Sequence, residues 1–341
     1  MTIRLERWLQ GPRGRCFVAL AASVRNGTIA WEYARPMDNR RREIQAALLH
    51  ALESVDPGTL LELSDRDIAL ALSHSVQWAY YWQEPWHDRV LGRSVFDDVL
   101  ARLAAPLDAH PATQGWSDPI DLDNQRHVEW TGLPKAALDG FAEIIAEDHR
   151  HEIATERRPP PSDPRANWSG RWTSIPPWNL PVTSSATPFA GARLLMVAED
   201  GPPAATAIVR PVTVLAPVRV LEIRTAEDFA HLVASAPLDV PLARRHTWYR
   251  ATGEVHHWCI PDWTRVSQHY DAIHVTIDAY LETAGRVLPI AGGATVMAGW
   301  EPDVTFWLSE RITLGEPPRR WSMESGNLEG LRWYLADDAT R

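Results

Sequence analysis

The sequence predicts an α+β protein in two unequal regions: a mainly helical N-terminal region with one β-hairpin, then a mostly antiparallel sheet domain. Three observations predict this fold class. Apolar residues recur at helical spacing between residues 44 and 148, short apolar runs separated by Gly and Pro turns follow residue 190, and a proline-rich polar stretch lies between them. The chain has 341 residues, which is longer than one hydrophobic core usually supports, so two domains are expected.

A β-hairpin is expected over residues 15–34. Two apolar runs, residues 16–24 and 28–33, flank the dipeptide Asn26-Gly27. Glycine has no Cβ and asparagine tolerates the left-handed region, so this dipeptide favours a two-residue turn with positive φ at both positions.

Four helices are expected after the hairpin, because apolar residues recur there at i, i+3 and i+4. The predicted spans are residues 44–55, 64–80, 94–103 and 135–148. Ser64 and Asp67 are a plausible capping pair for the second helix. The fourth is expected to turn Leu138, Phe141, Ile144 and Ile145 inward.

The boundary between the two regions is expected at residues 156–167. Residues 157–164 carry four prolines among polar side chains, which is typical of a linker or an ordered surface strap. The predicted regions are therefore residues 1–155 and 168–341.

The second region is expected to contain short strands. The predicted strands are residues 194–198, 207–209, 218–223, 273–277, 295–298 and 305–308. Two helices interrupt them, at residues 226–236, capped by Thr225 and Asp228, and at residues 262–270. Several links between strands are too short for a crossover helix, so the sheet is expected to be mostly antiparallel.

Composition bounds the setting of the protein. No stretch approaches the roughly 18 apolar residues of a membrane helix, and the charged N-terminus is unlike a signal peptide, so a cytoplasmic location is expected. In that reducing compartment Cys16 and Cys259 are expected to be free thiols. The net charge of −10 is spread along the chain, which opposes long-range attraction of nucleic acid. The sequence leaves the oligomeric state open.

The 17 tryptophans allow two interpretations. Large rings are typical of cores and domain interfaces, and they also line pockets for planar ligands.

Metal and nucleophile motifs are weak. His149, His151 and Glu152 lie close in sequence, as do His256 and His257, but neither group makes an HExxH or CxxC framework, so no metal is expected. There is no GxSxG motif. Cys259, with its neighbouring histidines and with Asp262 and Asp271 downstream, leaves a Cys-His-Asp hydrolase as a minor alternative to a buried thiol.

Three segments of the second region carry a resemblance: residues 170–176 (GRWTSIP), 270–281 (YDAIHVTIDAYL) and 298–308 (AGWEPDVTFWL). Their order is similar to that in a protein family of GC-rich bacteria. More distantly, it resembles the three signature strands of ADP-ribosyltransferases. The resemblance covers about residues 168–310.

The resemblance implies a site that binds and cleaves NAD. Its expected NAD-binding residues are Arg171, Thr173, Ser174 and Thr276. Its expected catalytic residues are Asp303, Glu301 and Tyr280, with Asp303 in the place of the usual catalytic glutamate. The implied function is ADP-ribosyl transfer to a protein or nucleic-acid target, or NAD glycohydrolysis.

Each of these residues also has a structural interpretation. Arg171 could be an ion-pair partner, Thr276 and Tyr280 packing residues, and 301–303 a turn before a strand. The alternative function is a non-enzymatic interaction protein with tryptophan-rich binding surfaces.

Overall fold

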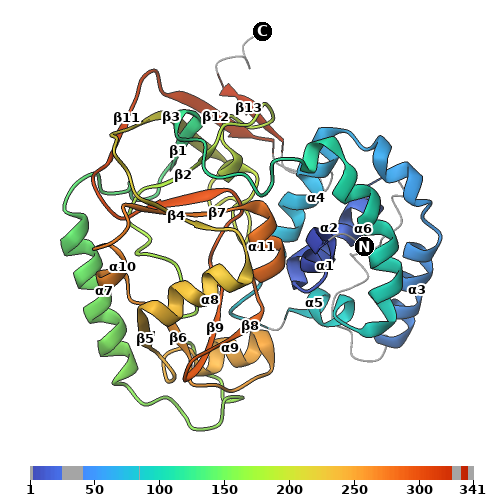
Figure 1. Cartoon of the computed structure of the whole chain (residues 1–341), viewed down its shortest axis with the longest axis horizontal. Coiled ribbons are helices and arrows are strands. Elements are labelled where there is room, and N and C mark those ends of the chain that lie inside the picture. The colour runs from blue at the N-terminus through green and yellow to red at the C-terminus, as the bar shows by residue number, and fades with distance from the viewer. Residues whose placement is uncertain (1–2, 25–40, 84, 325–331, 337–341) are drawn as a thin grey trace.

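The computed structural model describes residues 3–24, 41–83, 85–324 and 332–336, and it has the predicted α+β architecture. Helices gather in the N-terminal part of the chain, and a mostly antiparallel sheet lies in the rest (Figure 1). No helix among the described residues is long and apolar enough to cross a bilayer.

The N-terminal part is a group of helices packed around a common core. They are α1 (Ile3–Trp8), α2 (Pro12–Ser23), α3 (Arg41–Glu53), α4 (Asp65–Gln77), α5 (Trp86–Leu91) and α6 (Asp97–Ala109). The capping box predicted at the start of α4 is confirmed: Asp67 N donates to Ser64 Oγ at 3.2 Å, and Ser64 N donates to Asp67 at 2.9 Å. The predicted helices at 44–55 and 94–103 correspond to α3 and α6.

The first arm of the predicted hairpin is wrong, because residues 12–23 form α2. Nearly every side chain of α2 from Cys16 to Ala22 is buried, since α4, α5, α6 and α11 surround it. A helix buried on all sides has no polar face, so its sequence reads as one apolar run, as a buried strand does. Asn26, Gly27 and the second arm lie outside the described residues.

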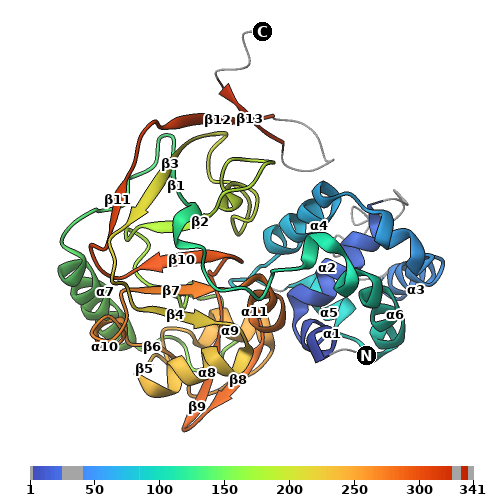
Figure 2. The same cartoon turned by 45° about the horizontal axis from the view of Figure 1, so that its top comes forward.

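The main sheet of the described residues has nine strands. Eight follow the order β13-β12-β3-β1-β2-β10-β7-β4, and β11 pairs with β3. The strands are β1 (Gln125–Trp130), β2 (Val182–Ser185), β3 (Thr206–Val214), β4 (Val220–Ile223), β7 (Ala272–Val275), β10 (Val304–Trp307), β11 (Ile312–Leu314), β12 (Arg319–Met323) and β13 (Trp333–Leu335). Among these pairs only β4 and β7 run parallel (Figure 2).

Further elements flank this sheet. The helices are α7 (Phe141–Glu156), α8 (Ala226–Ser235), α9 (Arg245–Thr252), α10 (Trp263–Val266) and α11 (Ile277–Thr283). Two small ribbons are β5 (Pro237–Asp239) with β6 (Cys259–Pro261) and β8 (Val287–Ile290) with β9 (Gly293–Val296). The predicted cap of α8 is confirmed, because Asp228 N donates to Thr225 Oγ1.

Three other expectations need correction. Residues 135–140 are not helical, and Leu138 is exposed, because Gly140 adopts a left-handed φ of 70° just before α7 begins. Residues 194–198 do not form a strand: a 3₁₀ turn, Arg193–Leu195, packs beneath α4, where Ser73 Oγ donates to Met196 O. The helix expected at 262–270 is only the single turn α10.

The helical part is joined to the sheet through α11. Arg4 and Trp8 of α1 both donate to Asp278 of α11, at 2.8 and 2.9 Å, and Arg7 pairs with Glu282 at 2.7 Å. Figure 1 shows α11 between the sheet and the helices α1 and α2. Both regions therefore contribute to the packing beside this helix.

The change of architecture comes earlier in the chain than residues 156–167. β1 lies between β2 and β3 inside the sheet, and α7 packs against α10 on the same part of the molecule. Both elements fall in the segment expected to be mainly helical. The proline-rich stretch instead lies over α9, where His246 contacts Asp163 O at 3.0 Å and Arg165 donates to Tyr249 at 3.1 Å.

Candidate functional site

A pocket of about 830 Å³ lies on the sheet, beside the inner strands β1, β2 and β10. Residues 127–130 of β1, the loop 131–136 and the loop 198–203 form much of its wall. Trp130 and Trp178 line it, and Trp178 is 69% exposed. A volume of this size is typical of a site for a small organic ligand.

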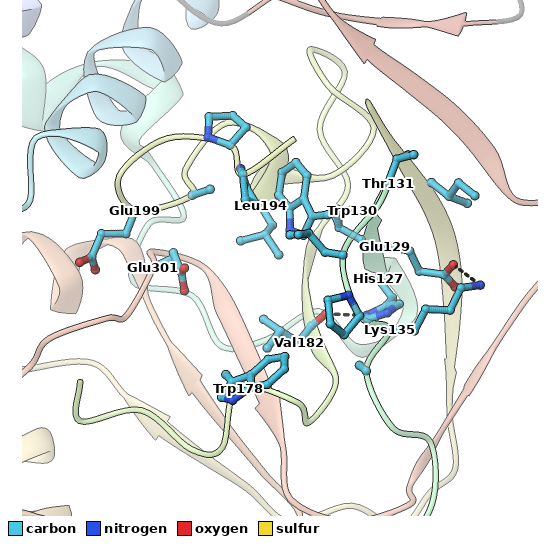
Figure 3. A pocket seen from close by; sticks show the side chains of 18 of the residues that line it. His127, Glu129, Trp130, Thr131, Lys135, Trp178, Val182, Leu194, Glu199 and Glu301 are labelled. Atoms are coloured by element: carbon cyan, nitrogen blue, oxygen red, sulfur yellow. Dashed lines mark hydrogen bonds and ion pairs between the residues drawn. The ribbon is translucent and has the colours of Figure 1, made fainter. Parts of the chain in front are cut away.

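Two carboxyl groups lie together at one end of this pocket, those of Glu199 and Glu301 (Figure 3). Desolvation raises the pKa of Glu301 to about 8. Burial raises the pKa of Glu199 well above its usual range, and the negative charge of Glu301 raises it further. Neither carboxyl group has an ion-pair partner among the described residues, although the Arg13 charge partly offsets the rise in the pKa of Glu199. Two such coupled carboxyl groups hold a proton at neutral pH and titrate as a pair.

Both oxygens of Glu199 are buried, and no described side chain donates a hydrogen bond to them; only the backbone N–H of Gly299 faces this carboxyl group. The hydroxyl groups of Tyr81 and Tyr280 are also buried and face each other, and no other described side chain completes a hydrogen bond with either. Burial raises the pKa of both phenols, and the Glu199 charge adds to the effect. Unpaired buried polar groups are rare in native proteins, and each calls for an explanation such as a functional role.

The loop that carries Glu301 is fixed by Ser174. Ser174 Oγ accepts from Ala298 N at 3.1 Å and from the Trp300 indole at 3.0 Å, and Ser174 N donates to Ala298 O at 2.9 Å. Gly299 has a φ of 83°, and a Cβ there would lie 3.0 Å from a methyl carbon of Thr173. Only glycine suits this conformation and this close approach.

The loop that carries Glu199 is fixed from the helical part. The Trp82 indole donates to Asp200 at 3.0 Å, and Asp200 itself has a φ of 59°. A non-glycine residue in the left-handed region is uncommon and is often found near functional sites. Both regions of the molecule therefore shape the carboxyl pair.

The opposite end of the pocket carries a third acid that is paired. Glu129 contacts Lys135 at 2.9 Å and Arg210 at 3.0 Å. Although burial opposes its ionisation, these two cations hold the pKa of Glu129 below its usual range. The pocket thus presents an ionised, paired acid at one end and a protonated acid at the other.

Arg171 does not lie in this pocket. It pairs with Asp148 at 2.9 Å and with Glu152 at 2.7 Å, on the part of the molecule that α7 covers. Thr173 O accepts two hydrogen bonds from Arg244. In this structure Arg171, Thr173 and Ser174 are engaged in contacts within the fold.

Asp303 and Thr276 line a second, smaller cavity of about 330 Å³. Asp303 accepts from Arg193 at 2.7 Å and from Ser185 Oγ at 3.1 Å, and His274 Nε2 lies 3.6 Å from it. Burial opposes its ionisation, but His274 and Arg193 hold the pKa of Asp303 below its usual range. Thr276 Oγ1 accepts from Ala279 N at the start of α11, so this hydroxyl is a helix cap.

His274 is held between two carboxylates. Its Nδ1 lies 2.7 Å from Glu222, on the side opposite Asp303. Burial opposes a charge on this ring, but the two acids raise the pKa of His274 to about 9. The Asp303 carboxylate is therefore neutralised by two cations and is not a free acid facing a ligand.

The residues predicted to bind or cleave NAD therefore lie at separate places in the fold. Glu301 and Tyr280 belong to the cluster at the large pocket, Asp303 and Thr276 to the small cavity, and Arg171 to neither. Glu199 and Tyr81 were not predicted from the sequence. Neither lies in a motif, and only the three-dimensional contact with Glu301 and Tyr280 distinguishes them.

The minor alternative of a Cys259 nucleophile lacks support in the geometry. Burial and the Asp239 carboxylate raise the pKa of Cys259 to about 12, which is the reverse of the shift that activates a thiol. The two acids considered for it are engaged elsewhere: Asp262 lies 3.2 Å from His149, and Asp271 pairs with Arg219. Cys16 and Cys259 are both buried free thiols, as predicted.

Most tryptophans are part of the packing. Trp8, Trp248, Trp258, Trp300 and Trp307 are fully buried. Trp178 is the most exposed of the described tryptophans, and it faces the large pocket. The tryptophans therefore fit both interpretations: most of them pack in the core, and a few line a pocket.

No protein-family profile, curated protein or solved structure matches the chain.

Proposed function

We propose that the protein is a hydrolase that cleaves a glycosidic bond in the large pocket, with Glu301 as the proton donor. The observation that carries this proposal is the carboxyl pair Glu199 and Glu301, which has no ion-pair partner among the described residues and lies in a pocket lined by two tryptophans. A carboxyl group whose pKa is raised by burial is the recurring proton donor of glycoside cleavage.

The protonation state of Glu301 suits a leaving group that would otherwise depart as an anion. With a pKa of about 8, the acid is mostly protonated at pH 7. Its proton passes to the glycosidic oxygen as the carbon–oxygen bond breaks, and the alcohol leaves neutral. A water molecule then adds to the sugar cation and gives its extra proton to the carboxyl pair, which restores the starting state.

The walls of the pocket favour a sugar ring or a heterocycle. The indole faces of Trp130 and Trp178 provide flat apolar surfaces for such a ring, and Lys135 and Arg320 offer donors for hydroxyl or phosphate oxygens. The volume of about 830 Å³ holds a ligand of two to three rings.

NAD cleavage, the reaction implied by the sequence resemblance, makes a different demand on the same acid. Nicotinamide leaves NAD as a neutral molecule, so no proton donor is needed. A carboxylate that stabilises the sugar cation would be needed instead. The rate would then rise with pH through 8, whereas proton donation by Glu301 makes the rate fall there.

The test is incubation of the purified chain with oligosaccharides, nucleosides and NAD between pH 5 and 10, following reducing sugar, free base and nicotinamide. We expect hydrolysis of at least one neutral glycoside, with a rate that declines above pH 8 as Glu301 ionises. Nicotinamide release that increases through pH 8 would contradict the proton-donor role. An absence of any cleavage would contradict the proposal of a hydrolase.

A further inference from the structure

We propose that Asp239, His257 and Cys259 form a binding site for a Zn²⁺-like divalent metal ion, with one coordination position open to solvent. The three side chains each place one ligand atom in a group whose members all lie within 4.8 Å of one another. No metal is expected from the sequence, because its histidines form no HExxH or CxxC framework. Asp239 is 18 and 20 residues away from His257 and Cys259, so no local motif joins the three residues.

The β5–β6 ribbon places the three side chains on one face. Asp239 pairs directly with Cys259 in the antiparallel register. His257 comes two residues before Cys259, so both side chains project to the same side of an extended chain. His256, one residue earlier, is held elsewhere by Glu254 at 2.6 Å and by the Trp258 ring.

The two separations that involve Asp239 are close to those that a tetrahedral ion requires. His257 Nε2 lies 3.0 Å from Asp239 Oδ1, and Cys259 Sγ lies 3.4 Å from the same oxygen. For bond lengths of about 2.0 Å to N and O and about 2.3 Å to S, tetrahedral angles separate N from O by about 3.3 Å and S from O by about 3.5 Å. These two separations therefore differ from the tetrahedral values by a few tenths of an ångström, and the ligand atoms of His257 and Cys259 lie within 4.8 Å of each other.

The backbone around the site is fixed on both strands. Ala294 N of β9 donates to His257 O at 2.9 Å, and Val240 N donates to Trp258 O at 2.8 Å. A Cβ at Gly293 would lie 2.1 Å from His257 O, so the two backbones are in close contact. The ligands are therefore positioned before any ion arrives, which lowers the cost of ordering them.

The donor set selects the class of metal. One thiolate, one imidazole and one carboxylate suit Zn²⁺ and its tetrahedral substitute Co²⁺, and do not suit Mg²⁺ or Ca²⁺. The bound thiol releases its proton, so the thiolate and carboxylate charges neutralise the ion. Cys259 is buried, whereas His257 and Asp239 are 48% and 69% exposed at their side chains, and the fourth position therefore faces solvent.

The test is titration of the full metal-free chain with Co²⁺, followed by its thiolate-to-cobalt charge-transfer absorption. We expect one equivalent to bind per chain with a near-ultraviolet thiolate band that Zn²⁺ removes by displacement. Cys259→Ser should abolish the band, and His257→Asn and Asp239→Asn should each weaken binding at least tenfold.

His256→Asn is the matched control, because this neighbouring ring lies outside the site. It should leave the affinity and the band unchanged. A band that persists in Cys259→Ser, or the absence of stoichiometric binding to the wild-type chain, would overturn the proposal. The carboxyl pair at the large pocket is not part of this site, so the outcome is independent of the proposed hydrolase function.

Discussion

Replacing Glu152 by glutamine is expected to lower the free energy of unfolding by about 3–5 kcal/mol. Glu152 of α7 is buried between two arginines. Arg244 contacts it with both terminal nitrogens, at 2.6 and 3.0 Å, and Arg171 contacts it at 2.7 Å. Arg244 has no exposed surface, so the variant would leave its charge buried without a counter-ion. Urea unfolding at neutral pH measures the effect.

Glu147→Gln is the matched control, since Glu147 lies on the same helix and is exposed. Its effect should stay within about 0.5 kcal/mol. Arg171→Ala should fall between the two, because Arg171 is partly exposed and Arg244 would still neutralise Glu152. A loss below about 1 kcal/mol for Glu152→Gln would show that this buried pair is not a major source of stability.

Glu301→Gln is expected to slow cleavage of glycosides with poor leaving groups by about 10²–10⁴-fold. Glutamine keeps the shape of the side chain but has no proton to donate. The leaving group of a 4-nitrophenyl glycoside is 4-nitrophenolate, which departs readily as an anion. The rate of cleavage of this substrate should therefore fall far less. Comparing kcat for the two substrate types measures the contribution of proton donation, and an equal loss for both would contradict that role.

Two controls keep this comparison clear. Glu227→Gln, at an exposed position on α8, should leave both rates unchanged. Measuring the free energy of unfolding excludes misfolding of the variant as the cause of a lower rate. Folding raises the pKa of Glu301 from 4.5 to about 8, so between these pH values the folded chain binds this proton more tightly than the unfolded chain does. The free energy of unfolding of the wild type therefore falls as pH rises through this window, and Glu301→Gln removes that loss.

Local signals in the sequence predicted the local structure well. The capping box of Ser64 and Asp67 and the cap at Thr225 depend on residues three positions apart, so each pattern determines its own geometry. The antiparallel sheet was predictable because short links exclude crossover helices. Helix α2 was not predictable in this way, because the helices that bury it on every side come from distant parts of the sequence.

The candidate site depends on contacts that no local pattern records. Glu199 and Glu301 are a hundred residues apart, and the burial that raises their pKa values comes from both regions of the fold. Ser174 was expected to contact NAD but instead fixes the loop that carries Glu301. Its hydroxyl would serve either role, and only the position of the Trp300 loop distinguishes them.

The protonation state of the carboxyl pair is the central claim, and infrared difference spectroscopy tests it most directly. We expect the wild-type chain to show the carbonyl band of protonated carboxylic acid at pH 7, and the band should weaken as pH rises through about 8, because Glu301 ionises while its charge keeps Glu199 protonated. In Glu301→Gln the loss of intensity near pH 8 should be absent, because the group that titrates there is gone. If the wild-type spectrum at pH 7 contains no protonated carboxyl band, the pair is ionised, and Glu301 is not the proton donor.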